Sequence, residues 1–334
     1  MNIGLTLGKY APFHKGHEYV ISTALNEMDH VIVVVYNASE VTDIPTKIRA
    51  NWIKNIFPSV EIIIAEDGPQ DTGYTTEIIS KQNNYLKYLL NGIPINSFYS
   101  SEKYGTHVSE ALNCKNRIVD IDRSNFPISA SKIREENNIL KIKSFLSKNV
   151  YDTIKPKYYF IGAPSTGKTT ISQACANLLN GAYCVEYGRE YWFKFQENHR
   201  LSMNDLENIA IEHTKLEEKI FEENYDCAFI DTSVLTTFCY ALYYFNKSSN
   251  TLTSIFENSL YKYKHVFLCN DDIPFDDTWD RSGPKSRGIL QEINKEVLKQ
   301  YNLKYVLLSG TLEQRIELVK KYITEEVFYD NIQC

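Results

Sequence analysis

The chain has 334 residues, of which 43% are hydrophobic and 23% are charged, and its net charge at pH 7 is −6. This length suits two domains of ordinary size, each of which can bury a core of its own. The acidic balance disfavours a nucleic-acid partner, because such partners bind to a basic surface.

The sequence also lacks segments that would target or anchor a protein outside the cytoplasm. Its densest apolar run, residues 31–35, is far too short to span a bilayer. The N-terminus has no basic region followed by an apolar stretch, as a secretory signal requires. Seven cysteines without a CxxC pair fit reduced thiols better than a disulfide frame or a zinc site. We therefore expect a cytoplasmic protein without membrane insertion.

Strand-like and helix-like segments alternate along the first half of the chain. The predicted strands cover residues 2–7, 31–36, 61–66, 97–100 and 117–120. The predicted helices cover residues 17–26, 44–57 and 74–90, with further helix from residue 129 onward. β-Branched runs such as residues 31–35 suit strands that are covered on both faces, as in a parallel sheet. The alternation predicts a doubly wound α/β domain over residues 1–150.

The turn after the first predicted strand has the parts of a phosphate-binding site. It reads GKYAPFHKGH, with Gly8 directly after the strand and His14, Gly16 and His17 at the start of a predicted helix. Glycine lets the backbone approach a polyphosphate closely, and a helix N-terminus offers unpaired N–H groups. The two imidazoles can donate to charge that moves onto a leaving pyrophosphate, and Lys9 can add a positive charge.

A second stretch, ISASKIR, starts a later predicted helix. Ser129 is placed to cap this helix, because its hydroxyl can accept from a free N–H of the first turn. Ser131, Lys132 and Arg134 can then point at phosphates. Taken alone, the stretch is equally typical of a capped helix with a solvated basic face.

GKYAPFHKGH together with ISASKIR resembles the paired signature of HxGH nucleotidyltransferases, specifically the nicotinamide mononucleotide (NMN) adenylyltransferases. The resemblance implies a Rossmann-like domain in which the NMN phosphate attacks the α-phosphorus of ATP, with help from Mg²⁺, to give NAD and pyrophosphate. It implies ATP contacts from Gly8, Lys9, His14, Gly16, His17, Ser129, Ser131, Lys132 and Arg134, with His14, His17 and Arg134 as catalytic residues. Ser131 stands where threonine is more usual, a change that keeps the hydroxyl.

Two residues of the predicted helix 44–57 are candidates for contact with NMN. Arg49 and Trp52 lie one turn apart, where i and i+3 side chains share a face. A ring stacked on the nicotinamide and a guanidinium on its phosphate would suit them. Core packing of Trp52 and solvation of Arg49 are the alternative.

The second half repeats the alternation after a boundary at residues 149–156. The predicted strands cover residues 157–161, 182–185, 228–231, 265–268 and 305–308. Predicted helices lie between them, including a long polar one at residues 205–224. A second doubly wound parallel-sheet domain is therefore expected over residues 156–334.

The first loop of this half matches the P-loop pattern in full. Gly162-x4-Gly167-Lys168-Thr169 follows a predicted strand and precedes the helical run 170–179, as that loop requires. The loop N–H groups cradle phosphates, the lysine bridges the β- and γ-phosphates, and the threonine binds Mg²⁺. Asp231, at the end of a later strand, is the candidate Walker B carboxylate for the metal. The predicted ATP contacts are Gly162, Ser165, Thr166, Gly167, Lys168, Thr169 and Thr170.

A kinase also needs an acceptor site and a group that closes over the phosphoryl. Glu186 and Arg189 follow the second strand of this half, where an acceptor is commonly bound. The carboxylate could take a hydroxyl proton, the guanidinium could neutralise phosphate, and Trp192 could stack on a flat ring. A surface ion pair and a core aromatic are the alternatives.

Four segments of the second half, GAPSTGKTT, EYGREYW, FIDTSVLTT and DIPFDDTWDRSGPKSR, resemble those of ribosylnicotinamide kinase domains in the same order. The last resembles the lid of nucleoside kinases and offers Arg281, and after it Arg287, as the lid arginine. The order of adenylyltransferase and kinase resembles bifunctional NadR-type proteins over nearly the whole chain. It implies that nicotinamide riboside is phosphorylated with ATP and Mg²⁺ to NMN, which the first domain converts to NAD, and it allows a homo-oligomer.

Two departures from this family stand out. The DNA-binding domain of the regulator version does not precede the first strand, so repressor function is not expected. Ser233 stands where an acidic residue often follows Asp-Thr. Two alternatives share the motifs: a fused phosphopantetheine adenylyltransferase and dephospho-coenzyme A kinase, and a non-catalytic nucleotide-sensing regulator. The motifs also fit both the amidated and the acid form of the mononucleotide.

Overall fold

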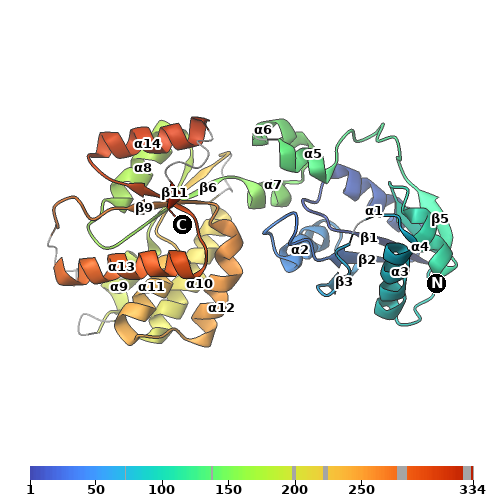
Figure 1. Cartoon of the computed structure of the whole chain (residues 1–334), viewed down its shortest axis with the longest axis horizontal. Helices are drawn as coiled ribbons and strands as arrows, with labels where there is room; N and C mark the ends of the chain where they lie inside the picture. Colours follow the sequence, from blue (N-terminus) through green and yellow to red (C-terminus); the bar gives the residue numbers. More distant parts are fainter. Residues whose placement is uncertain are drawn as a thin grey trace. The chain divides into compact units, whose positions relative to one another are not determined.

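The computed structural model describes residues 1–71, 73–136, 138–197, 201–220, 225–276, 284–325 and 332–333. It divides into two compact units, Met1–Ile154 and Lys155–Cys334, and each unit has a sheet of its own (Figure 1). None of the described helices is long and apolar enough to cross a membrane.

The first unit contains a parallel sheet with the strand order β3-β2-β1-β4-β5. Its strands are β1 (Ile3–Gly8), β2 (His30–Tyr36), β3 (Glu61–Ala65), β4 (Ser97–Ser100) and β5 (Lys115–Ile118). Its helices are α1 (Lys15–Glu27), α2 (Thr46–Ile56), α3 (Thr76–Leu90), α4 (Gly105–Leu112), α5 (Ala130–Glu135), α6 (Ile139–Ile142) and α7 (Lys148–Ile154). The strand order reverses between β1 and β4, and a doubly wound sheet opens its ligand crevice at such a point.

The apolar run in β2 is continuous because both faces of the sheet are covered. Successive side chains of a strand point to opposite faces. Ile32 and Val34 therefore pack in one core with Leu86 and Leu90 of α3. Val33, on the opposite face, is also fully buried. The predicted parallel sheet of the first half is confirmed.

The second unit contains a sheet with the order β11-β10-β9-β6-β8-β7, parallel except for β11 at its edge. Its strands are β6 (Lys157–Ile161), β7 (Ala182–Cys184), β8 (Ala228–Asp231), β9 (His265–Cys269), β10 (Tyr305–Leu308) and β11 (Ile332–Gln333). Its helices are α8 (Lys168–Leu178), α9 (Tyr187–Phe195), α10 (Met203–Lys219), α11 (Val234–Phe245), α12 (Asn250–Ser259), α13 (Pro284–Gln300) and α14 (Leu312–Glu325).

Helices cover both faces of this second sheet (Figure 1). Tyr159 and Ile161 of β6 share a core with residues of α10, α11, α12 and α13. Tyr158 and Phe160, which point the other way, pack with residues of α8 and α14. The second doubly wound domain is therefore confirmed, and its central strand leads directly into the P-loop.

Several predicted boundaries shift for local reasons. The helix predicted from residue 44 begins at Thr46, after the N-cap Pro45. The strand predicted at 117–120 ends at Ile118, because Asp120 adopts a left-handed backbone with φ of +53°. Helix α4 was not predicted, and its N-cap Tyr104 makes no side-chain cap that would signal a start. Residues 221–224 of the predicted helix 205–224 lie outside the described residues.

Candidate active sites

A cavity of about 690 Å³ opens in the first unit at the carboxyl ends of β1 and β4. Gly8 at the end of β1, His17 on α1 and Ser100 at the end of β4 contribute to its lining. Ser131 and Arg134 of α5 line it from the ISASKIR stretch. The cavity lies where the strand order reverses, and the residues that line it come from both predicted signatures.

The two histidines of the first signature cap helix α1. Nδ1 of His14 accepts from the N–H of Gly16 at 3.1 Å, and the N–H of His14 donates to Nδ1 of His17 at 3.3 Å. The rings stack with 3.7 Å between their centroids. Because each Nδ1 is an acceptor, the proton of each neutral ring lies on Nε2. His17 lines the cavity, whereas His14 is 5% exposed and holds the turn together.

Both imidazoles are neutral donors at physiological pH. Burial is the main cause that lowers the pKa of His14 to about 4, and the charge of Arg123 lowers it further. Burial, then His14, then Arg123 lower the pKa of His17 well below its ordinary value. A neutral Nε2–H can still donate to a phosphate oxygen. Lys9 and Arg134 are cationic side chains in this lining, and Lys9 is paired with Glu40, which also lines the cavity.

The histidine pair should make the first unit less stable in mild acid. The unfolded chain protonates His14 near its ordinary pKa of about 6.5, whereas the folded protein resists protonation down to about pH 4, so stability falls with pH through that window. A His14→Asn variant keeps a capping oxygen and loses the titrating group. Between pH 7 and pH 5 the variant should lose about 2 kcal/mol less unfolding free energy than the unaltered chain.

Amide exchange in α1 and β1 measures this difference for the first unit alone. The control is His30→Asn, because His30 pairs with Glu61 at the surface and caps no helix. The control reports the effect of removing a surface histidine that takes no part in the α1 cap. If His14→Asn and the unaltered chain lost equal unfolding free energy between pH 7 and pH 5, His14 would not be the source of the acid sensitivity.

Arg134 connects the two signatures of the first unit. Its guanidinium donates to the carbonyl of Ala11 in the first signature and to the hydroxyl of Ser131 at 3.3 Å. Ser129 caps α5, as expected, by accepting from the N–H of Lys132 at 3.3 Å. The side chain of Lys132 is exposed and is not among the residues that line the cavity. Gly16 also lies outside the cavity lining, and its N–H donates to Nδ1 of His14 in the turn before α1.

The prediction that Arg49 and Trp52 contact NMN requires a correction. Arg49 is 1% exposed, and Trp52 is 3% exposed. The guanidinium donates to the carbonyls of Lys9, Tyr36 and Ile44 and to the hydroxyl of Thr46. The indole N–H donates to Thr153 Oγ1 at 3.0 Å. These contacts fix the backbone beside the cavity and pack α2, and neither side chain lines the cavity.

Sequence reasoning missed a polar pair in the same cavity. Nδ1 of His107 lies 3.0 Å from Oδ1 of Asn83, and Nδ2 of Asn83 donates to the carbonyl of His107 at 3.4 Å. Both residues line the cavity, from α4 and α3 respectively. They are 24 positions apart, so no local motif marks them.

In the second unit, the P-loop has the backbone that its glycines require. Gly162 has φ of +134°, and an added Cβ would lie 2.8 Å from the carbonyl oxygen of Cys269. Gly167, the N-cap of α8, has φ of +83°. Nζ of Lys168 donates to the carbonyl of Ala163 at 2.8 Å, so the ammonium already lies over the loop.

The remaining predicted ATP contacts occupy different environments. Ser165 lines the neighbouring cavity together with Lys168. Thr166 is fully buried and donates to the carbonyl of Ala163 at 2.9 Å. Thr170 is exposed on α8. Of the predicted ATP contacts, Ser165 and Lys168 therefore line the neighbouring cavity, whereas Thr166 and Thr170 do not.

Asp231 has the surroundings of a metal-binding carboxylate. It is fully buried, and its Oδ1 has no hydrogen-bond partner among the described residues. Burial, followed by the charge of Glu186, raises the pKa of Asp231 to about 6, although a hydrogen bond from Thr169 opposes the shift. A buried carboxylate oxygen without a partner beside a threonine hydroxyl fits Mg²⁺, which prefers hard oxygen ligands.

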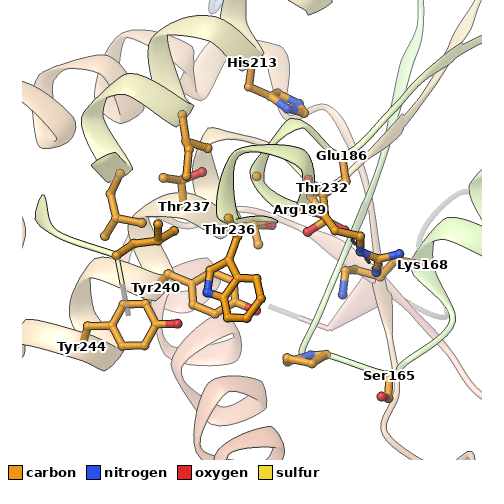
Figure 2. Close-up of a pocket in the computed structure, with 16 residues that line it drawn as sticks. Ser165, Lys168, Glu186, Arg189, His213, Thr232, Thr236, Thr237, Tyr240 and Tyr244 are labelled. Carbon is orange, nitrogen blue, oxygen red and sulfur yellow. Dashed lines mark ion pairs between the residues drawn. The ribbon is translucent and has the colours of Figure 1, made fainter. Parts of the chain in front are cut away.

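A second cavity, of about 110 Å³, lies beside the P-loop. Figure 2 shows Lys168, Glu186 and Arg189 together at one end and Tyr240 and Tyr244 at the other. The carboxylate of Glu186 lies 3.5 Å from the guanidinium of Arg189. Trp192 also lines the cavity. All three predicted acceptor residues therefore meet at one site.

Helix α11 adds a row of residues that sequence reasoning missed. Thr236, Tyr240 and Tyr244 recur every four positions, so they share one face of the helix and line the cavity. His213 of α10 lines it as well, and its Nε2 has no hydrogen-bond partner among the described residues. The helical spacing in α11 was readable from the sequence, although its direction toward the P-loop was not.

The two candidate lid arginines have different outcomes. Arg281 lies outside the described residues. Arg287 is 7% exposed on α13 and donates to the carbonyls of Ile273, at 2.9 Å, and Ser165, at 3.2 Å. It is not among the residues that line the cavity. In this structure Arg287 bonds the P-loop backbone, and its direct contact with ATP stays a prediction.

Fold and sites together define the class of protein: a Rossmann-like nucleotidyltransferase domain followed by a P-loop kinase-like domain. Residues 5–136 match the family model described as cytidylyltransferase-like. Residues 157–315 match the family model described as an AAA domain.

The chain is similar to NadR proteins along nearly its whole length. It is 25% identical to the trifunctional NAD biosynthesis/regulator protein NadR of Salmonella typhimurium, over 97% of this chain and 84% of the relative. A crystal structure of a NadR protein in complex with NAD and AMP-PNP matches at a TM-score of 0.62 and 20% identity, covering 100% of this chain and 98% of that chain. A crystal structure of a NadR protein in complex with NR matches at a TM-score of 0.62 and 21% identity, covering 97% of this chain and 96% of that chain. The resemblance predicted from the motifs is confirmed.

Proposed function

We propose that the chain is a bifunctional NAD salvage enzyme. Its second unit phosphorylates nicotinamide riboside with ATP to give NMN, and its first unit transfers the adenylyl group of a second ATP to NMN to give NAD and pyrophosphate. The observation that carries this proposal is the presence of two separate phosphate-binding loops, each beside its own cavity. The names of the whole-length relatives, a NAD biosynthesis protein and complexes with NAD, AMP-PNP and NR, support the choice of substrates.

Adenylyl transfer in the first unit needs positioning and charge neutralisation rather than a side-chain nucleophile. A phosphate oxygen of NMN attacks the α-phosphorus of ATP, a new P–O bond forms, and the bond to the β-phosphate oxygen breaks. His17 and Arg134 line the cavity where the departing pyrophosphate would gain charge. Lys9 adds a second cation at the same wall. His14 supports them by capping the helix.

Phosphoryl transfer in the second unit uses the P-loop and the carboxylates beside it. The 5′-hydroxyl oxygen of the riboside attacks the γ-phosphorus, its proton passes to Glu186, and ADP leaves. Lys168 moves from its contact with Ala163 to the phosphates. Asp231 and Thr169 would hold Mg²⁺, which neutralises phosphate charge when bound. Arg189, paired with Glu186, neutralises the phosphoryl group in transfer.

The side chains that line the acceptor cavity support a riboside with a flat cationic ring as the substrate. The polar end of the cavity, with Lys168 and Glu186, suits the reacting hydroxyl (Figure 2). Its aromatic end, with Tyr240 and Tyr244 (Figure 2), suits the pyridinium ring, because aromatic faces attract cations. Trp192 lines the same cavity. The hydroxyl of Thr236 is buried without a partner among the described residues and can bond the acceptor between these ends.

Product analysis tests the proposal against its alternatives. Nicotinamide riboside, ATP and Mg²⁺ should yield NMN and then NAD. The fused coenzyme A enzyme would instead convert phosphopantetheine to dephospho-coenzyme A and coenzyme A. A non-catalytic regulator would consume no ATP with either acceptor. The cytoplasmic location, the lack of a nucleic-acid partner and a homo-oligomeric assembly stay predictions from the sequence.

A further inference from the structure

Three buried side chains bond the backbone of the P-loop. Nη1 of Arg315, on α14, donates to the carbonyl of Thr166 at 2.7 Å, and Nη2 of Arg287, on α13, donates to the carbonyl of Ser165 at 3.2 Å. Oε1 of Gln291, also on α13, accepts from the N–H of Ala163 at 2.9 Å. The exposed fractions of the three side chains are 3%, 7% and 1% in the order just given.

The backbone N–H groups of a P-loop cradle phosphates, and each of the two carbonyls shares its peptide group with one of these N–H groups. The carbonyl of Ser165 shares its peptide group with the N–H of Thr166, and the carbonyl of Thr166 shares its group with the N–H of Gly167. A cation that bonds the carbonyl fixes the plane of the peptide and polarises its N–H, which strengthens the bond that this N–H makes to an anion. An added Cβ on Gly167 would lie 3.7 Å from Nη1 of Arg315, so the guanidinium is directly against the loop.

The loop needs such support because its backbone is strained. Ser165 has a left-handed backbone with φ of +59°, which a residue other than glycine adopts only when its surroundings enforce it. Arg315 is itself fixed in place. Its Nε donates to the carbonyl of Gly310 at 3.1 Å, and its Nη2 donates to the carbonyl of Asn270 at 3.2 Å and to Asp272. Gln291 also donates from Nε2 to the carbonyl of Cys269 at 3.0 Å.

We propose that Arg315, Arg287 and Gln291 are positioning residues that hold the P-loop ready for the phosphates of ATP. The inference rests on the proposed kinase function of the second unit. P-loop donors contact the phosphates in both the bound substrate and the transition state. Loss of their alignment therefore weakens both states equally, which raises the KM for ATP and leaves kcat little changed.

The test measures ADP formation with nicotinamide riboside as acceptor and varied ATP. Arg315→Gln and Arg287→Gln should each raise the KM for ATP on the order of ten-fold, because each removes a charge-assisted hydrogen bond. Arg315→Lys, which keeps the charge and can bond the same carbonyl, should recover part of the loss. Lys320→Gln is the matched control on α14, because Lys320 pairs with Glu317 at the surface. Pyrophosphate formation from NMN, the reaction of the first unit, should be unchanged in every variant.

The outcomes separate this inference from the proposed function. An unaltered chain that forms no ADP from the riboside would overturn the kinase function, and the inference with it. An active chain in which Arg315→Gln and Arg287→Gln lower thermal stability but keep the KM for ATP would overturn the inference alone. If Arg315→Gln does not fold, Gln291→Glu replaces it, because it is nearly isosteric and places a negative charge against the loop. An unchanged KM for ATP in Gln291→Glu would also overturn the inference.

Discussion

Replacing Lys168 by alanine should abolish phosphorylation of nicotinamide riboside and leave adenylyl transfer to NMN intact. Its ammonium is the one P-loop side-chain cation, and its reach over the loop to the carbonyl of Ala163 places it within range of a bound phosphate. Removing a cation that neutralises charge in a phosphoryl-transfer transition state costs on the order of 10³-fold in kcat/KM. ADP formation from riboside and ATP measures the loss.

The same chain supplies an internal control for this variant. Pyrophosphate formation from NMN should stay at the level of the unaltered protein, because Lys168 belongs to the second unit. Lys295→Ala is the matched control on the surface of α13, where Lys295 pairs with Glu292. It should keep both activities. If a folded Lys168→Ala protein also lost pyrophosphate formation, the claim that the two reactions use separate sites would be contradicted.

Replacing His17 by alanine should have the opposite pattern. His17 lines the cavity of the first unit, and its Nδ1 is occupied by the N–H of His14, so Nε2–H is the donor left for phosphate. Removing one donor aimed at developing charge costs roughly 10²- to 10³-fold in kcat. Pyrophosphate formation from NMN and ATP should fall by that factor, while riboside phosphorylation stays normal.

The variant also removes one bond of the α1 cap, which costs about 1 kcal/mol of stability. Thermal unfolding must therefore be measured beside activity, so that loss of fold is separated from loss of a donor. His30→Ala is the control, since His30 lies at the start of β2 and pairs with Glu61. A folded His17→Ala protein with full adenylyl transfer would contradict the donor role.

The sequence was sufficient for the parallel strands of both sheets and for both phosphate loops, because each depends on local patterns, whereas the antiparallel edge strand β11 was not predicted. The β-branched run in β2 indicates a strand buried on both faces, and the structure has it so. Gly162 and Gly167 stand where the backbone takes positive φ, which their spacing implied. Ser129 caps α5 as the motif predicts. These features need only a few consecutive residues to specify them.

What the sequence could not supply are contacts between distant residues. Arg315 bonds a P-loop carbonyl 149 positions away, and Gln291 bonds the loop 128 positions away. Arg287 was expected at ATP, and in the structure it bonds a P-loop carbonyl 122 positions away. Arg49 was expected at a ligand or in solvent, yet four acceptors of the surrounding chain hold its guanidinium. Such outcomes depend on how elements pack, which short spacings do not encode.

In the proposed function, one chain converts nicotinamide riboside to NAD through two separate sites. Mass spectrometry of products from isotope-labelled riboside, ATP and Mg²⁺ tests it most directly. We expect labelled NAD, with one ADP and one pyrophosphate formed for each NAD. Labelled riboside that remains unphosphorylated, in a folded protein supplied with ATP and Mg²⁺, would contradict it.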